Sequence, residues 1–143
     1  MVAMAMERYR TQPTILVVED YADSRVMLKL LLEDEGYSVF TASDGREALA
    51  IAAKETIDLV LTDFGLPDIN GVSLVRQLRR QNEHLSRIPI IMLTALDAKE
   101  YEGSATQAGC TDFLVKPPDY DRLEKIIEFS LRNYDLEQYK VEA

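Results

Sequence analysis

Short apolar segments alternate with segments of helical period five times along this 143-residue chain, and this alternation constrains the fold more than any other feature. Each apolar segment is rich in Val, Ile, Leu or aromatic residues and is too short for a helix, so each is predicted to be a strand. The predicted strands are 15–18, 37–42, 57–61, 88–93 and 113–115. Five strand–helix units in alternation predict a parallel sheet covered by helices on both faces.

The segments between the strands have the apolar spacing of amphipathic helices. In the first, Met27, Leu30 and Leu31 lie at helical spacing, and Gly36 is suited to end the helix. Further helices are predicted over 45–55, 71–81 and 119–134, with apolar positions at Ala48, Leu49 and Ala52, at Leu74, Val75 and Leu78, and at Leu123, Ile126, Ile127 and Leu131. The segment 99–108 has few apolar anchors, so we expect it to be the least firmly held helix.

Right-handed crossovers leave few ways to order five parallel strands. We expect a flavodoxin-like, doubly wound (βα)5 α/β fold with strand order 2-1-3-4-5, whose switch point lies between strands 1 and 3. The length suits one domain. We assign residues 13–135 to this domain, 1–12 to a flexible N-terminal arm and 136–143 to a C-terminal tail that could extend the last helix.

Charge and composition narrow the classes of function. The formal net charge of −9 argues against direct binding to nucleic acid, because phosphate-rich partners require basic surfaces. No segment has the roughly 18 consecutive apolar residues of a membrane span, and the N-terminus lacks the features of a secretory signal. The chain is therefore expected in the cytoplasm. We interpret Cys110, the single cysteine, as a small packed side chain.

Three basic residues are expected to have structural rather than functional roles. Arg79 and Arg80 are interpreted as the polar end of a helix, and His84, the single histidine, as a solvated loop residue.

Polar residues stand at the carboxyl ends of four predicted strands. Glu19 and Asp20 follow the first, Asp63 the third, Thr94 the fourth and Lys116 the fifth. The carboxyl ends of parallel strands share one edge of the sheet, so these side chains are expected to converge beside the switch point. Three converging carboxylates repel one another unless they are compensated. Mg²⁺ with oxygen ligands would compensate them.

These side chains form a set suited to phosphoryl transfer. An aspartate can be the nucleophile and form an aspartyl-phosphate. Mg²⁺ and Lys116 would neutralise the transferring oxygens, and Thr94 would donate a hydrogen bond to one of them. A carboxylate at the end of a buried strand is costly unless its charge is used. We therefore interpret Asp63 as the phosphoryl acceptor.

At its strand ends the sequence resembles the receiver domain of two-component response regulators, in a single-domain, chemotaxis-regulator-like form. The motifs VVED, LVLTDFGLPDING, IIMLTA and DFLVKPP occur in the expected order between about residues 14 and 134. The resemblance implies that a sensor histidine kinase or a phosphotransfer protein phosphorylates Asp63. It also implies that Glu19, Asp20, Asp63 and the backbone carbonyl of Gly65 hold Mg²⁺.

The same resemblance implies a switch. Thr94 and Lys116 would sense the phosphoryl group, and Phe113, which stands where the family often has Tyr, would be the aromatic switch residue. The Lys116–Pro117 bond is expected to be cis. Phosphorylation would change the surface formed by the fourth helix, the fifth strand and the fifth helix, which would bind a downstream protein. Phosphorylation-dependent dimerisation through this surface is left open.

Two positions near Asp63 depart from the family pattern. Gly65 and Leu96 stand where polar side chains often flank the phosphorylation site. Neither can orient a water behind the phosphorus, so we expect slow loss of the phosphoryl group. On the last helix, Phe129 lies off the apolar stripe, and the sequence leaves open whether it is exposed to a partner or lies at the edge of the core.

Other functions that occur on this fold require residues that differ from those present. A pseudo-receiver, an interaction module that is not phosphorylated, would be expected to lose Asp63, Thr94 or Lys116, and all three are present. A haloacid dehalogenase-type phosphatase would need an aspartate where Gly65 stands, and a P-loop NTPase or a flavodoxin would need a phosphate-binding loop. We therefore expect a signalling switch rather than an enzyme. A fragment of a longer regulator would have the same features.

Overall fold

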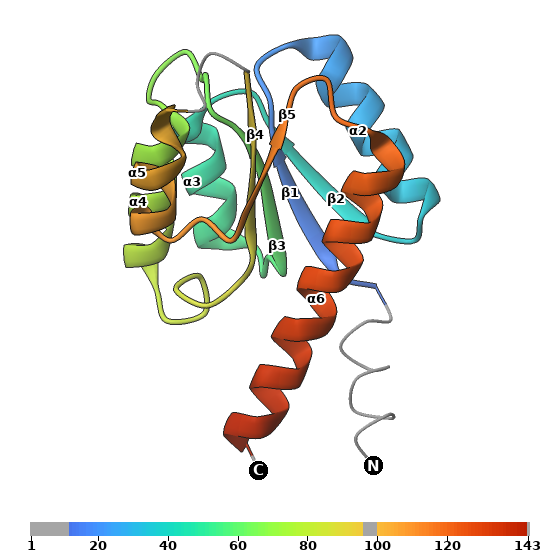
Figure 1. The fold of residues 1–143 in the computed structure, drawn as a ribbon, viewed down its shortest axis with the longest axis vertical. Coiled ribbons are helices and arrows are strands. Elements are labelled where there is room, and N and C mark those ends of the chain that lie inside the picture. The colour runs from blue at the N-terminus through green and yellow to red at the C-terminus, as the bar shows by residue number, and fades with distance from the viewer. Residues whose placement is uncertain (1–11, 96–99, 143) are drawn as a thin grey trace.

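A five-stranded parallel sheet forms the centre of the protein (Figure 1). The structure is a computed structural model and describes residues 12–95 and 100–142, the side chains of 136–142 excepted. The strands are β1 Thr14–Val18, β2 Ser38–Ala42, β3 Leu59–Asp63, β4 Ile90–Thr94 and β5 Asp112–Val115. Their order is β2-β1-β3-β4-β5 and every pair is parallel. The predicted flavodoxin-like, doubly wound fold is confirmed.

Helices cover both faces of the sheet. They are α2 Ala22–Asp34, α3 Gly45–Lys54, α4 Gly71–Gln81, α5 Glu102–Ala108 and α6 Tyr120–Glu142. Helices α2 and α6 pack on one face, and α3, α4 and α5 pack on the other (Figure 1). Successive strand residues point to opposite faces, so Ile15 and Val17 join the core under α2 and α6, whereas Leu16 and Val18 join the core under α3 to α5.

The predicted apolar stripe of α2 is wrong. The residues buried against the sheet are Leu28 and Leu32, whereas Met27, Leu30 and Leu31 remain 41%, 61% and 41% exposed. The two sets are offset by about one position along a leucine-rich helix, so the sequence spacing alone does not choose between them. Packing of Leu28 and Leu32 with the sheet and with α6 decides which set is buried. Helix α2 consequently has an exposed apolar face.

Several element boundaries differ from the prediction. Ile57 and Ile88 are fully buried but precede the ladders of β3 and β4, because an apolar run records burial and not where hydrogen bonding begins. Helix α6 continues through the predicted tail to Glu142. The predicted N-terminal arm, 1–12, lies outside the described residues except for residue 12, and the domain limits 13–135 remain a prediction.

Arg79 lies in the last turn of α4, the helix end predicted for it, but it also binds backbone carbonyls. The interpretation of His84 as a solvated loop residue is wrong. The Arg79 guanidinium donates to the carbonyl oxygens of Leu85 (2.9 Å), Ile88 (2.6 Å) and Gly109 (3.1 and 2.6 Å). His84 is half-buried, with Nε2 2.7 Å from the carbonyl oxygen of Ile57. Both side chains satisfy carbonyls that the sheet and helices leave unpaired.

Cys110 lies within the core on the α3–α5 side, as its interpretation as a packed side chain predicts. Burial raises the pKa of its thiol to about 11. Its thiol therefore stays protonated at neutral pH.

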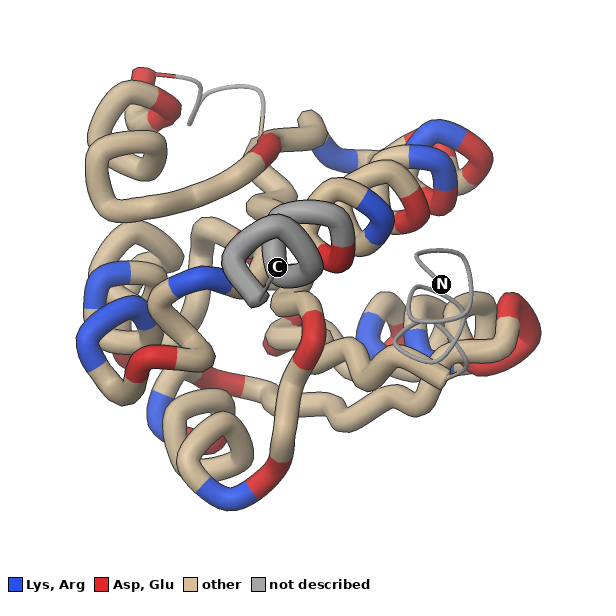
Figure 2. Tube along the Cα trace, turned by 90° about the horizontal axis from the view of Figure 1, so that it is seen from below, with Lys and Arg blue, Asp and Glu red and all other residues tan. Residues whose placement is uncertain are grey.

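The helices carry interspersed charges of both signs, as the tube view from below shows (Figure 2). Ion pairs one helical turn apart join Lys29 to Glu33 and Arg132 to Glu128. Within residues 12–95 and 100–142, no helix is long and apolar enough to cross a membrane.

Candidate functional site at the carboxyl edge of the sheet

Three carboxylates meet where β1 and β3 end. Asp63 is the last residue of β3, and Glu19 and Asp20 follow β1 directly. One carboxylate oxygen from each residue lies within 4.8 Å of the others. Glu19 and Asp63 are buried, whereas Asp20 is exposed. The structure therefore brings together the three carboxylates that the sequence predicts at this edge.

Lys116, which follows β5, bridges two of these carboxylates. Its Nζ lies 2.9 Å from Glu19 Oε2 and 2.9 Å from Asp63 Oδ2. Burial lowers the pKa of Lys116, but the hydrogen bonds to Asp63 and Glu19 outweigh burial and raise the pKa above its ordinary value. The side chain is therefore a stable cation inside the acidic cluster. The Lys116–Pro117 bond is cis, as predicted.

Thr94 presents a buried hydroxyl at the end of β4. The residue is 1% exposed, and its Oγ1 has no hydrogen-bond partner among the residues that the structure describes. An unsatisfied buried hydroxyl costs about 1–3 kcal/mol, so this atom is available to a ligand. Phe113 on β5 is half-buried and packs against the core on the α3–α5 side.

The loop after β3 is held close to Asp63. The backbone N–H of Gly71, the first residue of α4, donates to the carbonyl oxygen of Phe64 at 2.7 Å. A Cβ at Gly71 would lie 2.9 Å from the Asp63 carbonyl oxygen, so only glycine fits without a shift. Asn70 caps α4 by accepting from the N–H of Ser73. The sequence identifies Gly71 as a turn residue, but it does not indicate that Gly71 lies close to the Asp63 backbone.

Asp68 connects the same loop to α3. Its carboxylate accepts from the backbone N–H groups of Gly45 (2.9 Å) and Arg46 (2.8 Å). These hydrogen bonds, with the Gly45 bond the largest cause, lower the pKa of Asp68. The carboxylate is thus a second cap for α3, beside Asp44, which accepts from the N–H of Glu47.

An open pocket of about 510 Å³ leads from solvent to Asp63. It is lined by Asp63, Phe64, Gly65, Ala95, Glu100, Tyr101 and Lys116. Gly65 is exposed, and a Cβ there would meet nothing within 4 Å. Leu96, the second position predicted to affect the lifetime of the phosphoryl group, lies outside the described residues. Glu100 and Tyr101 are lining residues that the sequence did not indicate.

The donor set of this edge fits a hard divalent cation. Clustered carboxylate oxygens, one of them solvent-exposed, are the ligands that Mg²⁺ takes together with water and phosphate oxygens. The Lys116 cation neutralises part of the negative charge of the cluster through its ion pairs with Glu19 and Asp63.

A family model described as the response regulator receiver domain matches residues 15–128. The chain belongs to the response regulator receiver family. The receiver domain is 36% identical over 117 residues to the transcriptional regulatory protein ZraR of Salmonella typhimurium, a match over 82% of this chain and 26% of that protein. It is also 36% identical over 118 residues to the autoinducer sensor kinase/phosphatase CqsS of Vibrio cholerae, over 82% of this chain and 17% of that protein. The chain therefore spans about a quarter or less of these two relatives.

Solved structures agree with this assignment of a receiver domain. The chemotaxis response regulator CheY4 of Vibrio cholerae is 36% identical, with a TM-score of 0.78, and the match covers 84% of this chain and 99% of that chain. The receiver domain of sensor histidine kinase PA1611 from Pseudomonas aeruginosa, which has a magnesium ion coordinated in its active site cleft, is 33% identical. Its TM-score is 0.76, over 84% of this chain and 98% of that chain.

Proposed function

We propose that this receiver domain accepts a phosphoryl group on Asp63 from a sensor histidine kinase or a phosphotransfer protein, with Mg²⁺ bound, and signals by protein–protein contact. The observation that carries the proposal is the surroundings of the Asp63 carboxylate. It lies beside two other carboxylates and a lysine cation, and the neighbouring strand β4 ends in Thr94, whose buried hydroxyl has no partner in the described part of the chain.

Each side chain has a role in the proposed transfer. A carboxylate oxygen of Asp63 forms a bond to phosphorus while the bond to the donor histidine nitrogen breaks, and that nitrogen keeps the electron pair. Lys116 would exchange part of its contact with Asp63 for a phosphoryl oxygen, and Thr94 Oγ would donate to another. Glu19, Asp20, Asp63 and the Gly65 carbonyl would hold Mg²⁺, which neutralises charge on the transferring oxygens.

Intact mass measurement tests the proposal. The purified chain is incubated with Mg²⁺ and acetyl phosphate, a small phosphodonor that needs no protein partner. We expect the mass to rise by one phosphoryl group. The pseudo-receiver alternative predicts no gain.

The exposed apolar face of α2 is the surface we propose for the phosphodonor protein. Helix α2 begins two residues after Asp20, so this face borders the acidic edge. Five of the eight exposed large apolar side chains among the described residues lie at its cap or along it: Tyr21, Val26, Met27, Leu30 and Leu31. Apolar exposure concentrated on one helix is typical of an interaction surface.

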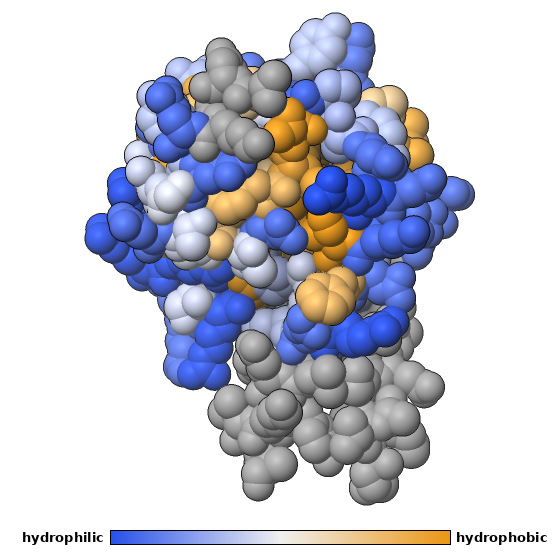
Figure 3. Space-filling view, viewed as in Figure 1, coloured by the Kyte–Doolittle hydropathy of each residue, from blue (hydrophilic) through white to orange (hydrophobic). Residues whose placement is uncertain are grey.

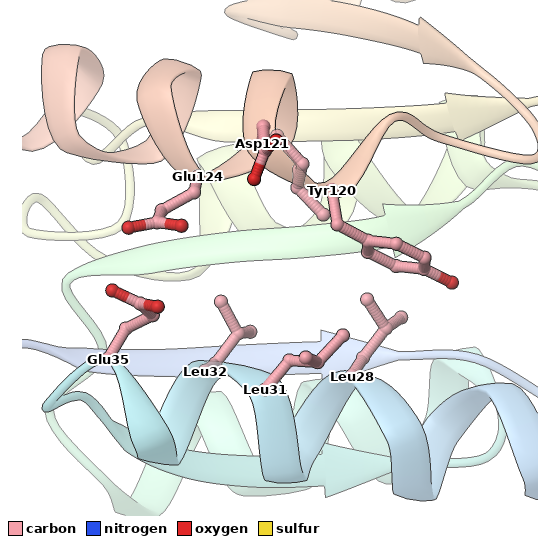
Figure 4. A pocket seen from close by; sticks show the side chains of 8 residues that line it. Leu28, Leu31, Leu32, Glu35, Tyr120, Asp121 and Glu124 are labelled. Carbon is pink, nitrogen blue, oxygen red and sulfur yellow. The ribbon is translucent and has the colours of Figure 1, made fainter.

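A groove of about 150 Å³ between α2 and α6 continues this face. Leu28, Leu31 and Leu32 line it from α2 and Tyr120 lines it from α6, as Figure 4 shows. At one end Glu35 and Glu124 face each other, and the hydrogen bond between the two carboxyls raises the pKa of Glu124. A basic side chain of a docked partner would be favoured at this end.

Leu30→Glu is expected to slow phosphoryl transfer from a phosphorylated donor protein by about tenfold or more, because it places a charge in a desolvated contact. Labelling by acetyl phosphate should be unchanged, since Leu30 is 61% exposed and does not line the pocket. The matched control is Phe129→Glu, which replaces a side chain that is 64% exposed on α6. Equal slowing by both variants would contradict docking through α2.

A second apolar surface, beside β5, supports the proposed output surface. Apolar side chains gather over the β5 edge, between α5 and α6, and are bordered by polar ones (Figure 3). Phe129 is exposed rather than part of the core, which resolves the alternative that the sequence left open. We propose that a downstream protein contacts this surface, so Phe129→Glu should weaken its binding while phosphorylation persists.

Gly65→Asn is expected to speed loss of the phosphoryl group by roughly threefold or more, because an amide beside the phosphorus can orient the attacking water. The added side chain fits, since nothing lies within 4 Å of the Cβ position. Decay is followed by intact mass after the donor is removed. Gly65→Ala is the control, because it adds a Cβ without a polar group. If both variants decay alike, side-chain polarity at this position does not set the lifetime.

A further inference from the structure

Two aromatic rings join the phosphorylation site to the start of α5. Phe64 follows Asp63 directly, and Tyr101 precedes the first residue of α5. Their ring centroids are 4.9 Å apart with an interplanar angle of 27°, a stacked arrangement. Both residues line the pocket that contains Asp63. The stack is therefore a direct link between this pocket and a helix of the proposed output surface.

The Phe64 side of the stack is fixed. Its N–H donates to the carbonyl oxygen of Leu93 at 2.9 Å, and its own carbonyl oxygen accepts from Gly71 at 2.7 Å. The ring packs partly against the core on the α3–α5 side. Phe64 is thus held by β4, by α4 and by the core, and any relative movement must come from Tyr101.

Helix α5 is held unequally at its two ends. At the C-terminal end, Arg79 donates two hydrogen bonds to the carbonyl oxygen of Gly109. At the N-terminal end, Tyr101 makes no side-chain capping hydrogen bond, and the position after Glu102 is Gly103, whose missing Cβ faces open space. Ala105 is the one buried residue of this seven-residue helix. The ring stack therefore ties the residue before the first turn to the Asp63 pocket.

The pocket also contains a charge that would respond to phosphorylation. Glu100 lies next to Tyr101 in the chain and lines the same pocket as Asp63. A phosphoryl group adds negative charge at Asp63, and like charges in a partly enclosed pocket repel. This repulsion acts on the backbone that carries the Tyr101 ring.

We propose that Tyr101 is a positioning residue: its stack on Phe64 holds the first turn of α5 against the Asp63 pocket, and phosphorylation releases this end while Arg79 retains the other. The inference rests on the proposed phosphorylation of Asp63. It assigns to Tyr101 a role that Phe113 and Thr94 do not perform, because neither of them lines this pocket or contacts α5 through a stacked ring.

Amide hydrogen exchange, followed residue by residue by NMR, tests the inference. The comparison is between residues 105–106, near the released end, and residues 109–110, at the Arg79 end. In unphosphorylated protein, Tyr101→Ala should speed exchange at 105–106 by about threefold to tenfold, the effect of losing one aromatic pair. Exchange at 109–110 should not change. Tyr101→Phe, which keeps the ring, should behave as wild type.

Addition of Mg²⁺ and acetyl phosphate should then speed amide exchange at 105–106 in the wild-type protein. The same addition should change exchange little in Tyr101→Ala, in which the stack is already absent. In Glu100→Gln the acceleration should be smaller than in wild type. Equal acceleration at 109–110, or no effect of Tyr101→Ala, overturns the positioning role. Mass gain without a change at 105–106 overturns the release step alone. Absence of a mass gain overturns both the proposed function and the release step. The comparison of Tyr101→Ala with Tyr101→Phe in unphosphorylated protein still decides whether the stack holds α5.

Discussion

Asp63→Asn is expected to abolish the mass gain that wild-type protein shows with Mg²⁺ and acetyl phosphate. The substitution keeps the size of the side chain but replaces the nucleophilic carboxylate oxygen with an amide, which does not attack phosphorus. It also leaves Lys116 hydrogen-bonded to Glu19, so the fold of this edge should persist. Circular dichroism checks the fold, and intact mass gives the result. Labelling that survives the substitution would place the nucleophile elsewhere.

Two further measurements separate the nucleophile from the metal. Chelation of Mg²⁺ with EDTA should stop labelling of wild-type protein, because the transferring oxygens lose their counter-charge. Asp20→Asn should still be labelled but at higher Mg²⁺ concentrations, because it removes one charged ligand and keeps Asp63. An unchanged requirement for Mg²⁺ would mean that Asp20 is not a ligand.

Arg79→Met is expected to lower the free energy of unfolding by about 2–4 kcal/mol, because it leaves partly buried carbonyls without their donor. The affected acceptors belong to Leu85, Ile88 and Gly109, which lie in the loop before β4 and at the end of α5. For a chain of this size the melting temperature should fall by roughly 5–15 °C. Methionine keeps the approximate length and the apolar part of the side chain, so the decrease in the free energy of unfolding measures the contribution of the guanidinium.

Arg80→Met is the matched control, since Arg80 is the next residue of α4 and is exposed. We expect its free energy of unfolding to stay within about 0.5 kcal/mol of wild type. Urea unfolding measures both variants. Equal stability of the Arg79 and Arg80 variants would mean that water replaces the guanidinium without cost.

The sheet could be predicted from the sequence because its strands are short apolar runs, and four of the five end in or are followed by a polar site residue. Asp63, Thr94 and Lys116 occur at such ends, and right-handed crossovers bring those ends to one edge. The convergence of the charged groups therefore follows from local patterns combined with a single rule of topology. The roles of these residues in phosphoryl transfer are proposals that the experiments above decide.

Helix α2 could not be predicted as well, because its sequence contains two overlapping apolar stripes. One contains Leu28 and Leu32, and the other contains Met27, Leu30 and Leu31. Both have helical spacing, and only packing against the sheet and α6 selects the first. The error has a functional consequence, since the stripe assigned to the core is the surface now proposed for the phosphodonor.

The contacts of Arg79, His84 and Tyr101 were also beyond sequence reasoning. Arg79 and His84 bond to backbone carbonyls, which every residue carries and which leave no pattern in the sequence. Tyr101 stacks on a ring far from it in the chain, and no local spacing relates the two. Such contacts depend on the tertiary structure alone.

The ion pair between Lys116 and Glu19 joins residues 97 positions apart in the chain. During synthesis the acidic residues leave the ribosome before the lysine that neutralises them. A nascent or clipped chain that ends before β5 would hold the carboxylates without their cation and without the edge strand beside Thr94. The proposed transfer to Asp63 would thus become possible only after β5 and Lys116 have been synthesised, and a chain that ends before them would not carry it out.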